Sequence, residues 1–241
     1  MIPTQFASRV TLLRERVESF DEYPFSLPVV RALDFIELHP KVTFLVGENG
    51  SGKSTLLEAI AIAMKFNPEG GSINFDFGTR ATHSPLHDYL RIAKGYRQHK
   101  DGFFLRAESF YNVATAVDNL GVVRSYGGRS LHALSHGESF MALLKNRFGP
   151  DSLYLLDEPE AALSPTRQVE ALQRLHELVQ QRCQFIIATH SPILMAYPDA
   201  LILNCGLDGV KPIAYEDTEH FRVTRDFLLH REKVFDILMK D

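Results

Sequence analysis

Apolar residues in this chain gather in short continuous runs, separated by longer segments with helical periodicity. Five runs lack polar alternation, as expected for strands covered on both faces. They lie at 42–46, 103–105, 153–156, 185–188 and 201–203. Helical patterns lie near 55–66, 165–182 and 217–239. This alternation predicts an α/β fold with a mostly parallel sheet flanked by helices.

The segments between these runs complete the predicted organisation. Residues 67–102 contain Pro68, Gly70, Gly71 and Pro85 and few long apolar runs, so they are predicted to form an irregular arm at the surface. Residues 109–150 are interpreted as a helical insertion. After residue 193 we expect a strand at 201–203, a turn at 206–209 and a helix near 218–239, which extend the sheet and pack on it. The length favours one domain over 1–241.

Eight consecutive residues match the phosphate-binding pattern G-x-x-x-x-G-K-[ST]. They are Gly47, Glu48, Asn49, Gly50, Ser51, Gly52, Lys53 and Ser54. The pattern lies between an apolar run and a helical segment that begins at Thr55, which is the context it requires. Its glycines let backbone N–H groups face an anion at a helix N-terminus. We expect the loop and Thr55 to bind a nucleoside triphosphate, with Lys53 at the β- and γ-phosphates and Ser54 supplying a hydroxyl to Mg²⁺.

Polar residues follow two other apolar runs. The run at 153–156 ends in Asp157 and Glu158, and the run at 185–188 is followed by Thr-His-Ser-Pro at 189–192. Ligands gather at the carboxyl ends of parallel strands, so these groups should lie beside the phosphate loop. We expect Asp157 to hold the Mg²⁺ shell, Glu158 to activate a water molecule and His190 to sense or orient the γ-phosphate.

Composition narrows the classes of function. The net charge of −4 gives no global sign of a nucleic-acid or anionic-membrane binder. Cys183 and Cys205 form neither a disulfide framework nor a zinc pattern, so a reducing cytoplasm is the expected location. The N-terminus carries charges where a signal peptide would be apolar, and no apolar stretch approaches membrane-spanning length.

The motifs occur in an order that resembles the ABC-type ATPase superfamily over residues 42–192. In order they are the phosphate loop, the Ser-His-Gly-Glu turn at 135–138, the Asp-Glu strand end at 157–158, Ala-Leu-Ser at 162–164 and His190. The resemblance implies two subunits paired head-to-tail around two ATP molecules, with Ser135, His136 and Gly137 acting on the nucleotide of the other subunit. His136, Glu138 and Ser164 depart from the transporter consensus.

Those departures make the chain look more like stand-alone bacterial ATPases and overcoming-lysogenisation-defect-type proteins, whose DEPE-type strand end is similar to residues 157–165. Chromosome-maintenance relatives insert a long coiled coil, and residues 55–133 are too few for one and lack heptads. A Gln that couples the metal site to the insertion is expected after the run at 103–105. The sequence offers Glu108 or Ser109 instead, and we assign Glu108 that role at the metal.

Two smaller features have alternative explanations. Tyr23 or Phe25 lies at a plausible distance before the loop to stack on adenine, and core packing explains either one about as well. Basic and aromatic residues interleave between 91 and 106, as on nucleic-acid surfaces, although a solvated face explains them more simply. The basic residues of this cluster are Arg91, Lys94, Arg97, Lys100 and Arg106.

The leading hypothesis is a soluble ATPase that dimerises around two ATP–Mg²⁺ and uses its open–closed cycle on an unidentified protein partner. In it Lys53, Glu158 and His190 are the catalytic residues. One alternative is the nucleotide-binding subunit of a transporter, which would need a separate membrane protein. Another is a DNA-associated ATPase of the repair or defence type, which rests on the basic stretch and on the resemblance.

Overall fold

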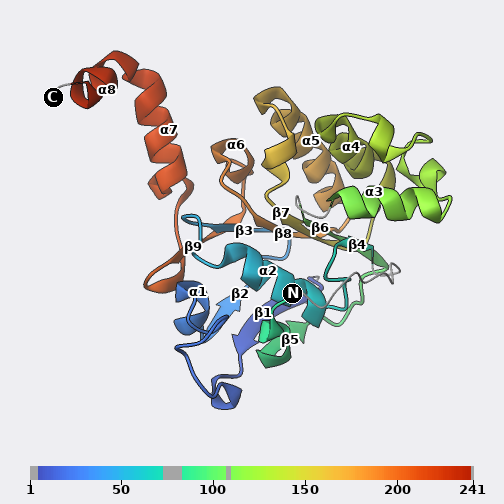
Figure 1. The fold of residues 1–241 in the computed structure, drawn as a ribbon, viewed down its shortest axis with the longest axis horizontal. Coiled ribbons are helices and arrows are strands. Elements are labelled where there is room, and N and C mark those ends of the chain that lie inside the picture. Colours follow the sequence, from blue (N-terminus) through green and yellow to red (C-terminus); the bar gives the residue numbers. More distant parts are fainter. Residues whose placement is uncertain (1–4, 73–82, 107–109, 240–241) are drawn as a thin grey trace.

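The computed structural model describes residues 5–72, 83–106 and 110–239 (Figure 1). Within them a seven-stranded sheet runs in the order β10-β9-β3-β8-β7-β6-β4, and a three-stranded antiparallel sheet runs β2-β1-β5. The strands are β1 (Ala7–Leu12), β2 (Phe35–Glu37), β3 (Val42–Val46), β4 (Gly71–Ser72), β5 (Leu90–Lys94), β6 (Asp101–Arg106), β7 (Ser152–Asp157), β8 (Gln184–Ala188), β9 (Leu201–Gly206) and β10 (Gly209–Pro212).

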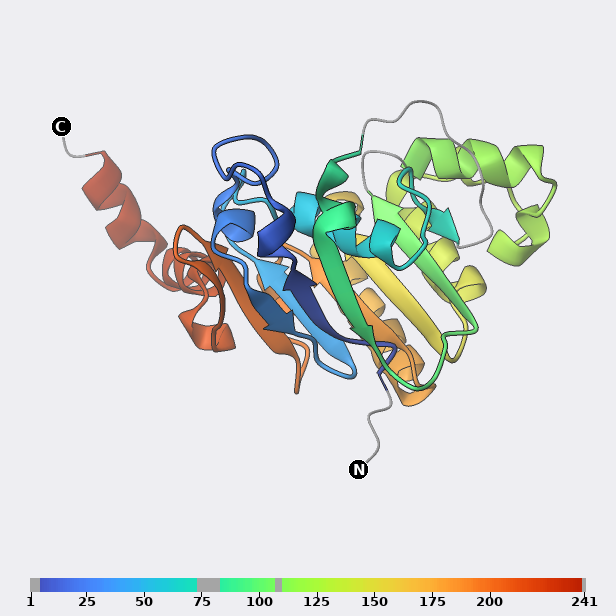
Figure 2. The ribbon, with the colours of Figure 1, turned by 90° about the horizontal axis from the view of Figure 1, so that it is seen from below.

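Helices cover both faces of the larger sheet (Figures 1 and 2). The α-helices are α1 (Pro28–Arg31), α2 (Lys53–Ala63), α3 (Phe110–Asn119), α4 (His136–Ala142), α5 (Pro165–Gln180), α6 (Pro192–Met195), α7 (Glu219–Leu229) and α8 (Arg231–Leu238). Short 3-10 helices lie at Arg14–Arg16, Pro85–Tyr89, Val123–Tyr126, Leu131–Ala133, Pro159–Ala162 and Tyr215–Asp217, and a π-helical turn at Leu143–Arg147 continues α4.

The central strands are apolar on both faces because two separate cores form against them. Phe44 and Ile187 point to the face covered by α3, α4, α5 and α6. Leu45 and Ile186 point to the opposite face, which α1, α2 and the smaller sheet cover. The five strands β9, β3, β8, β7 and β6 are parallel, so the expectation of a mostly parallel α/β sheet flanked by helices is confirmed.

Strand register places the functional ends side by side. Leu45 in β3 lies opposite Ala188 in β8, and Ala188 lies opposite Asp157 in β7. The phosphate loop, the acidic strand end and the His190 segment therefore leave the sheet at the same edge.

Two expectations about local structure were wrong. The described parts of residues 67–102 are not an irregular arm. Strand β5 pairs with β1, and Leu86, four residues before β5 in the sequence, is fully buried. The C-terminal pattern near 218–239 is not one helix but two, since α7 ends at Leu229 and α8 begins at Arg231, with His230 between them in a non-helical conformation.

The final helices also do not pack on the sheet. We call α7 and α8 together the C-terminal arm; neither helix buries a residue, and Figure 1 shows the arm extending away from the layers. Of the expected elements, only the strand at 201–203 extends the sheet, as β9, and β10, which the sequence did not predict, pairs with it at the edge. Exposed apolar side chains of the arm are Val223, Phe227, Leu228, Leu229, Phe235, Ile237 and Leu238.

Candidate functional site

The phosphate loop connects β3 to α2 with three glycines at positive φ. Gly47, Gly50 and Gly52 have φ of 141°, 77° and 100°. A Cβ on Gly47 would lie 2.4 Å from the carbonyl oxygen of Cys205, and one on Gly52 would lie 2.5 Å from Cγ1 of Val29. Both the backbone conformation and the close neighbours therefore require glycine at these two positions.

Lys53 is held at the loop it belongs to. Its Nζ donates to the carbonyl oxygens of Gly47 and Glu48, at 2.8 Å each, and the side chain is buried. Burial lowers the pKa of Lys53, and the nearby Cys205, Glu158 and Asp157 oppose that shift. The ammonium lies against the loop backbone, and it can bind a phosphate by exchanging these carbonyl partners.

Ser54 and Asp157 meet although they are far apart in the sequence. The Ser54 hydroxyl donates to Oδ1 of Asp157 at 2.9 Å, and Asp157 is buried at the end of β7. Hydroxyl and carboxylate oxygens beside a phosphate loop fit Mg²⁺, which takes few protein ligands and keeps waters and substrate phosphates. Within the described residues no cluster of three or more His, Cys, Asp or Glu could hold a metal by itself. The pair therefore fits an ion bound together with a nucleotide.

Glu158 adopts a left-handed backbone conformation directly after β7, with φ 48° and ψ 52°. This conformation is unfavourable for a residue other than glycine, and such strain occurs often at functional sites. The carboxylate is partly exposed, and its Oε1 lies 3.5 Å from Nε2 of His190. The structure thus brings together the two residues expected to act on the water and on the γ-phosphate.

Two further residues hold His190, and the sequence analysis assigned no role to either. Glu160 accepts a hydrogen bond from the backbone N–H of His190 at 2.6 Å. His220, in the first turn of α7, places its Nε2 2.9 Å from Nδ1 of His190. Glu160 belongs to the DEPE segment and could have been noticed there. His220 belongs to no sequence motif, and its contact with His190 arises only from the position of α7 in the fold. The sequence alone therefore gave no reason to select it.

Burial raises the pKa of Glu160, and the nearby Glu158 raises it further, whereas the hydrogen bond from the backbone N–H of His190 lowers it. Burial lowers the pKa of both His190 and His220, and Lys53 lowers each further. The two imidazoles are therefore neutral near pH 7, and each ring has one donor and one acceptor nitrogen.

The Ser-His-Gly-Glu turn forms the start of α4. Glu138 accepts from the backbone N–H of Ser135 at 3.0 Å and from its hydroxyl at 2.6 Å, and the Ser135 hydroxyl in turn accepts from the Glu138 backbone N–H, which makes a capping box. Gly137 is buried, and a Cβ there would lie 2.8 Å from the carbonyl oxygen of Ala162. Ser135 and His136 are exposed.

This turn does not complete the phosphate loop of its own chain. Helix α4 packs on the sheet face opposite to α2. Across the described ranges, no hydrogen bond or ion pair joins Ser135, His136 or Gly137 to residues 47–55. The exposed start of α4 is therefore available to a second chain.

The remaining candidate residues have different outcomes. Glu108 lies outside the described residues. Phe25 is buried and packs against Tyr89 with ring centroids 4.7 Å apart, so core packing accounts for it. Tyr23 is 64% exposed. In the basic cluster, Arg97 and Lys100 pair with Asp151, and Arg106 pairs with Glu58.

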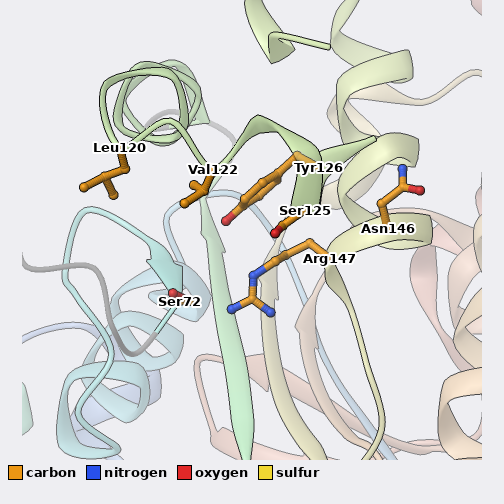
Figure 3. A pocket seen from close by; sticks show the side chains of 7 residues that line it. All are labelled: Ser72, Leu120, Val122, Ser125, Tyr126, Asn146 and Arg147. Atoms are coloured by element: carbon orange, nitrogen blue, oxygen red, sulfur yellow. The ribbon is translucent and has the colours of Figure 1, made fainter. Parts of the chain in front are cut away.

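Several cavities border these elements, and a small one of about 150 Å³ is lined by His136 and Glu158. A groove of about 520 Å³ runs along the outer side of the phosphate loop, between residues 48–51 and the turn from β9 to β10, and Glu219 of α7 also lines it. Another cavity of about 450 Å³ lies between the helical insertion and the sheet edge (Figure 3). Its guanidinium, Arg147, is bound by Asp101, and no residue of the phosphate loop lines it. The groove borders the phosphate loop at residues 48–51, whereas Lys53, Ser54 and Asp157 are not among its lining residues.

Comparison with known proteins identifies the family. The family model described as ABC transporter matches residues 33–161. The chain belongs to the ABC transporter family. It is therefore an ATP-binding ATPase of the ABC type, as the motif order led us to expect. No helix within the described residues is both long and apolar enough to cross a membrane.

Individual proteins to which the chain is similar include two curated relatives and one solved structure. The hemin import ATP-binding protein HmuV of Nocardia farcinica is 29% identical over 229 residues, covering 85% of this chain and 78% of its own. The zinc import ATP-binding protein ZnuC of Paracoccus denitrificans is 29% identical over 185 residues, covering 76% and 69%. A solved ATP-binding cassette of an ABC transporter in its ADP conformation superposes with a TM-score of 0.46 at 16% identity, covering 98% and 99%.

Proposed function

We propose that residues 1–241 work as one ATPase domain that binds ATP–Mg²⁺ between two copies of the chain and hydrolyses it there. One observation carries the proposal most directly: the Ser54 hydroxyl and the Asp157 carboxylate meet at 2.9 Å beside the loop that holds Lys53. This contact between two distant segments is what a site for ATP–Mg²⁺ needs.

Each residue has a specific task in the proposed reaction. Ser54 and Asp157 would hold Mg²⁺, which when bound neutralises charge on the phosphates. Backbone N–H groups of the loop and the Lys53 ammonium bind the β- and γ-phosphate oxygens and stabilise the charge that develops there. Glu158 accepts a proton from the attacking water, and His190 donates a hydrogen bond toward the γ-phosphate.

The signature-type turn completes the site from a second chain. Ser135, His136 and Gly137 lie on the sheet face away from α2, and two of these residues are exposed. A head-to-tail pair would bring each turn to the nucleotide of its partner, as the family resemblance implies. ATP binding would therefore drive dimerisation, and hydrolysis would release it.

Side-by-side assays of the wild type and Glu158→Gln test the hydrolytic role. We expect slow ATP turnover by the wild type, whereas Glu158→Gln binds ATP, turns over at least about a hundredfold more slowly and accumulates as a dimer. Light scattering after size exclusion, with and without ATP, measures the mass. Glu216→Gln, a change of an exposed carboxylate before α7, is the matched control. Normal turnover by Glu158→Gln would remove the base assignment.

Mixing two inactive variants tests whether the site is shared between chains. Lys53→Ala and Ser135→Arg should each be inactive, because each homodimer has a defect at both sites. In a mixed dimer the two defects fall on the same site, and the other site is intact. Activity that appears only on mixing supports a composite site, whereas two variants that stay inactive together would contradict it.

A second candidate is the nucleotide-binding subunit of a transporter, favoured by relatives whose names describe import ATP-binding proteins. In that case the unidentified partner is a membrane protein, and the chain should co-sediment with membranes from its own cells. Recovery in the cytoplasmic fraction, independent of nucleotide, would favour the stand-alone ATPase. The buried, unpaired Cys183 and Cys205 suit a reducing cytoplasm.

A DNA-associated role has less support. Three of the five basic residues that suggested it have carboxylate partners, Asp151 or Glu58, which reduce the positive charge available to phosphates. Binding to duplex DNA that weakens steeply with salt would support the DNA-associated role, and absence of DNA binding at low salt would exclude it.

A further inference from the structure

His190 is in contact with a second histidine from a distant part of the chain. The Nδ1 atom of His190 and the Nε2 atom of His220 lie 2.9 Å apart, which is a hydrogen-bond distance, and the ring centroids are 5.0 Å apart. His220 is the second residue of α7, so it belongs to the C-terminal arm and not to the motif-bearing core. Its position makes it the arm's direct contact with the proposed γ-phosphate residue.

The direction of this hydrogen bond follows from the other nitrogen of His190. Its Nε2 is buried and faces Oε1 of Glu158 at 3.5 Å. A bare lone pair facing a carboxylate would be repelled, so the proton lies on Nε2. Nδ1 of His190 is then the acceptor, and Nε2–H of His220 is the donor. Burial and Lys53 lower the pKa of both rings, and His190 also lowers that of His220, so both rings are neutral near pH 7. Glu158 opposes the shift at His190, and Glu219 and Glu160 oppose it at His220.

The start of α7 is fixed to the segment that carries His190, whereas the rest of the arm is not. Thr218 caps α7 by accepting from the N–H of Phe221, and Tyr215 donates its hydroxyl to the carbonyl of Pro192 at 2.9 Å. The rings of Tyr215 and Phe221 also pack, with centroids 4.6 Å apart. A displacement of the arm is therefore transmitted to residues 190–192 through its first turn.

We infer that His220 is a positioning residue for His190, and that the C-terminal arm sets the rate of ATP hydrolysis through this pair. The donor of His220 holds His190 in the form that carries its proton on Nε2, the nitrogen that faces Glu158 and that we propose donates toward the γ-phosphate. A partner or second chain that draws α7 away would break the contact between His220 and His190. ATP hydrolysis would then slow, while the phosphate loop would still bind ATP. The inference deepens the proposed function and rests on the role of His190 in it.

Nitrogen NMR tests the contact without any nucleotide. Long-range ¹H–¹⁵N spectra of the histidine rings report the tautomer, and His190→Asn identifies the His190 signals by their loss. We expect the Nε2–H form with a hydrogen-bonded Nδ1 in the wild type and in His220→Gln, whose amide can donate from a similar place. In His220→Leu the Nδ1 signal should move to that of an unbonded nitrogen. An Nδ1–H form in the wild type, or no change in His220→Leu, would overturn the inference.

Steady-state kinetics test the consequence. For His220→Leu we expect kcat to fall about tenfold, as is usual when a supporting hydrogen bond to an active group is lost, with KM for ATP unchanged within about twofold. His220→Gln should recover most of kcat. His230→Leu is the matched control. It removes an imidazole between α7 and α8 that is exposed and makes no capping hydrogen bond.

The outcomes separate the two proposals. If the wild type hydrolyses ATP and His220→Leu hydrolyses it equally fast, the inference is overturned and the proposed function stands. A wild type without turnover, or Glu158→Gln as active as the wild type, would overturn the proposed function, and the inference with it. A loss that His220→Gln does not recover and that raises KM as well would mean a structural role for His220.

Discussion

Gly47 directly follows β3 and lies against Cys205 near the end of β9. Its φ of 141° is unfavourable for other residues, and the carbonyl oxygen of Cys205 occupies the place of its missing side chain. Gly50 has a positive φ as well, but no atom lies within 4 Å of the Cβ it would carry. The two glycines therefore separate the cost of backbone strain from the cost of a steric clash.

Gly47→Ala should accordingly cost more stability than Gly50→Ala. We expect a loss of about 3 kcal/mol at Gly47, from strain and from overlap with a backbone atom that cannot rotate away. At Gly50 strain alone should cost about 1 kcal/mol. Urea unfolding of the nucleotide-free variants measures both free energies. Equal losses would show that β9 moves aside without cost.

The placement of single residues was predictable from the sequence where the motif is local. Residues 47–54 form one uninterrupted motif and Asp157 and Glu158 form another. The strand register places the ends of β3, β8 and β7 at one edge, and the start of α2 brings Ser54 to Asp157 there. The contacts of His190 were not predictable in the same way. His220 reaches it from 30 residues away, and no pattern in the sequence states how α7 leaves the sheet.

Gln184 joins two sheets at the scale of whole elements. Its side-chain oxygen accepts from the backbone N–H groups of Phe6 and Ala7, at 2.9 and 3.0 Å, and its amide donates to the carbonyls of Ala7 and His39, at 2.7 and 3.0 Å. All four bonds connect the first residue of β8 to the segments around β1 and β3. The side chain is buried, so water cannot replace it.

Gln184→Leu should destabilise the fold strongly, because it leaves several buried backbone groups without partners. Each such group costs about 1–3 kcal/mol, so a total loss of about 3 kcal/mol or more is expected. Thermal unfolding measured with Gln181→Ala as the exposed neighbouring control tests this expectation. A loss below about 1 kcal/mol would mean that β1 docks through its apolar side chains alone.

Asp151 links another set of elements through charge. Its carboxylate accepts from Arg182 after α5, at 2.6 and 2.9 Å, from Lys100 before β6, at 2.9 Å, and from Arg97, at 3.2 Å. The hydrogen bonds from Arg182, followed by that from Lys100, hold the pKa of Asp151 well below its usual range. The ionised form is therefore stabilised by folding.

This shift has a defined consequence for stability against pH. A carboxylate with a lowered pKa in the folded state adds stability above its unfolded pKa of about 3.9, and the gain is lost as pH falls toward the folded pKa. Asp151→Asn should therefore be less stable than the wild type at pH 7, and the difference should shrink below about pH 4. Urea unfolding across pH 3–7 tests this, and a constant difference would contradict the assignment.

The elements that the sequence predicted well are those buried on both faces. The run at 42–46 is β3 without any shift, and each of the other four runs lies inside a strand. Strands with one exposed face were missed, since β1 and β5 mix charged and apolar residues along a surface sheet. The break at His230 was also missed, because periodicity continues from α7 into α8 and the turn between them has no glycine or proline.

For the whole molecule, the family assignment makes nucleotide binding part of its stability. A ligand that binds only the folded state stabilises it by RT ln(1 + [L]/Kd). The loop residues 47–54 and Asp157 contact only when β3, β7 and α2 are assembled, so the unfolded chain offers no comparable site. The melting temperature should therefore depend on ATP concentration.

At ATP–Mg²⁺ a hundredfold above Kd we expect a gain of about 2.7 kcal/mol. Lys53→Ala should abolish the gain, and chelating Mg²⁺ should reduce it, because Ser54 and Asp157 would then face the phosphates with no cation between them. Asp157→Asn should retain part of the ATP effect and lose its Mg²⁺ dependence. Melting temperatures measured with ATP–Mg²⁺, with ATP and a chelator, and with Mg²⁺ alone separate the contribution of ATP from that of Mg²⁺. An ATP effect of the same size with and without Mg²⁺ would mean that the Ser54–Asp157 pair is structural and holds no ion.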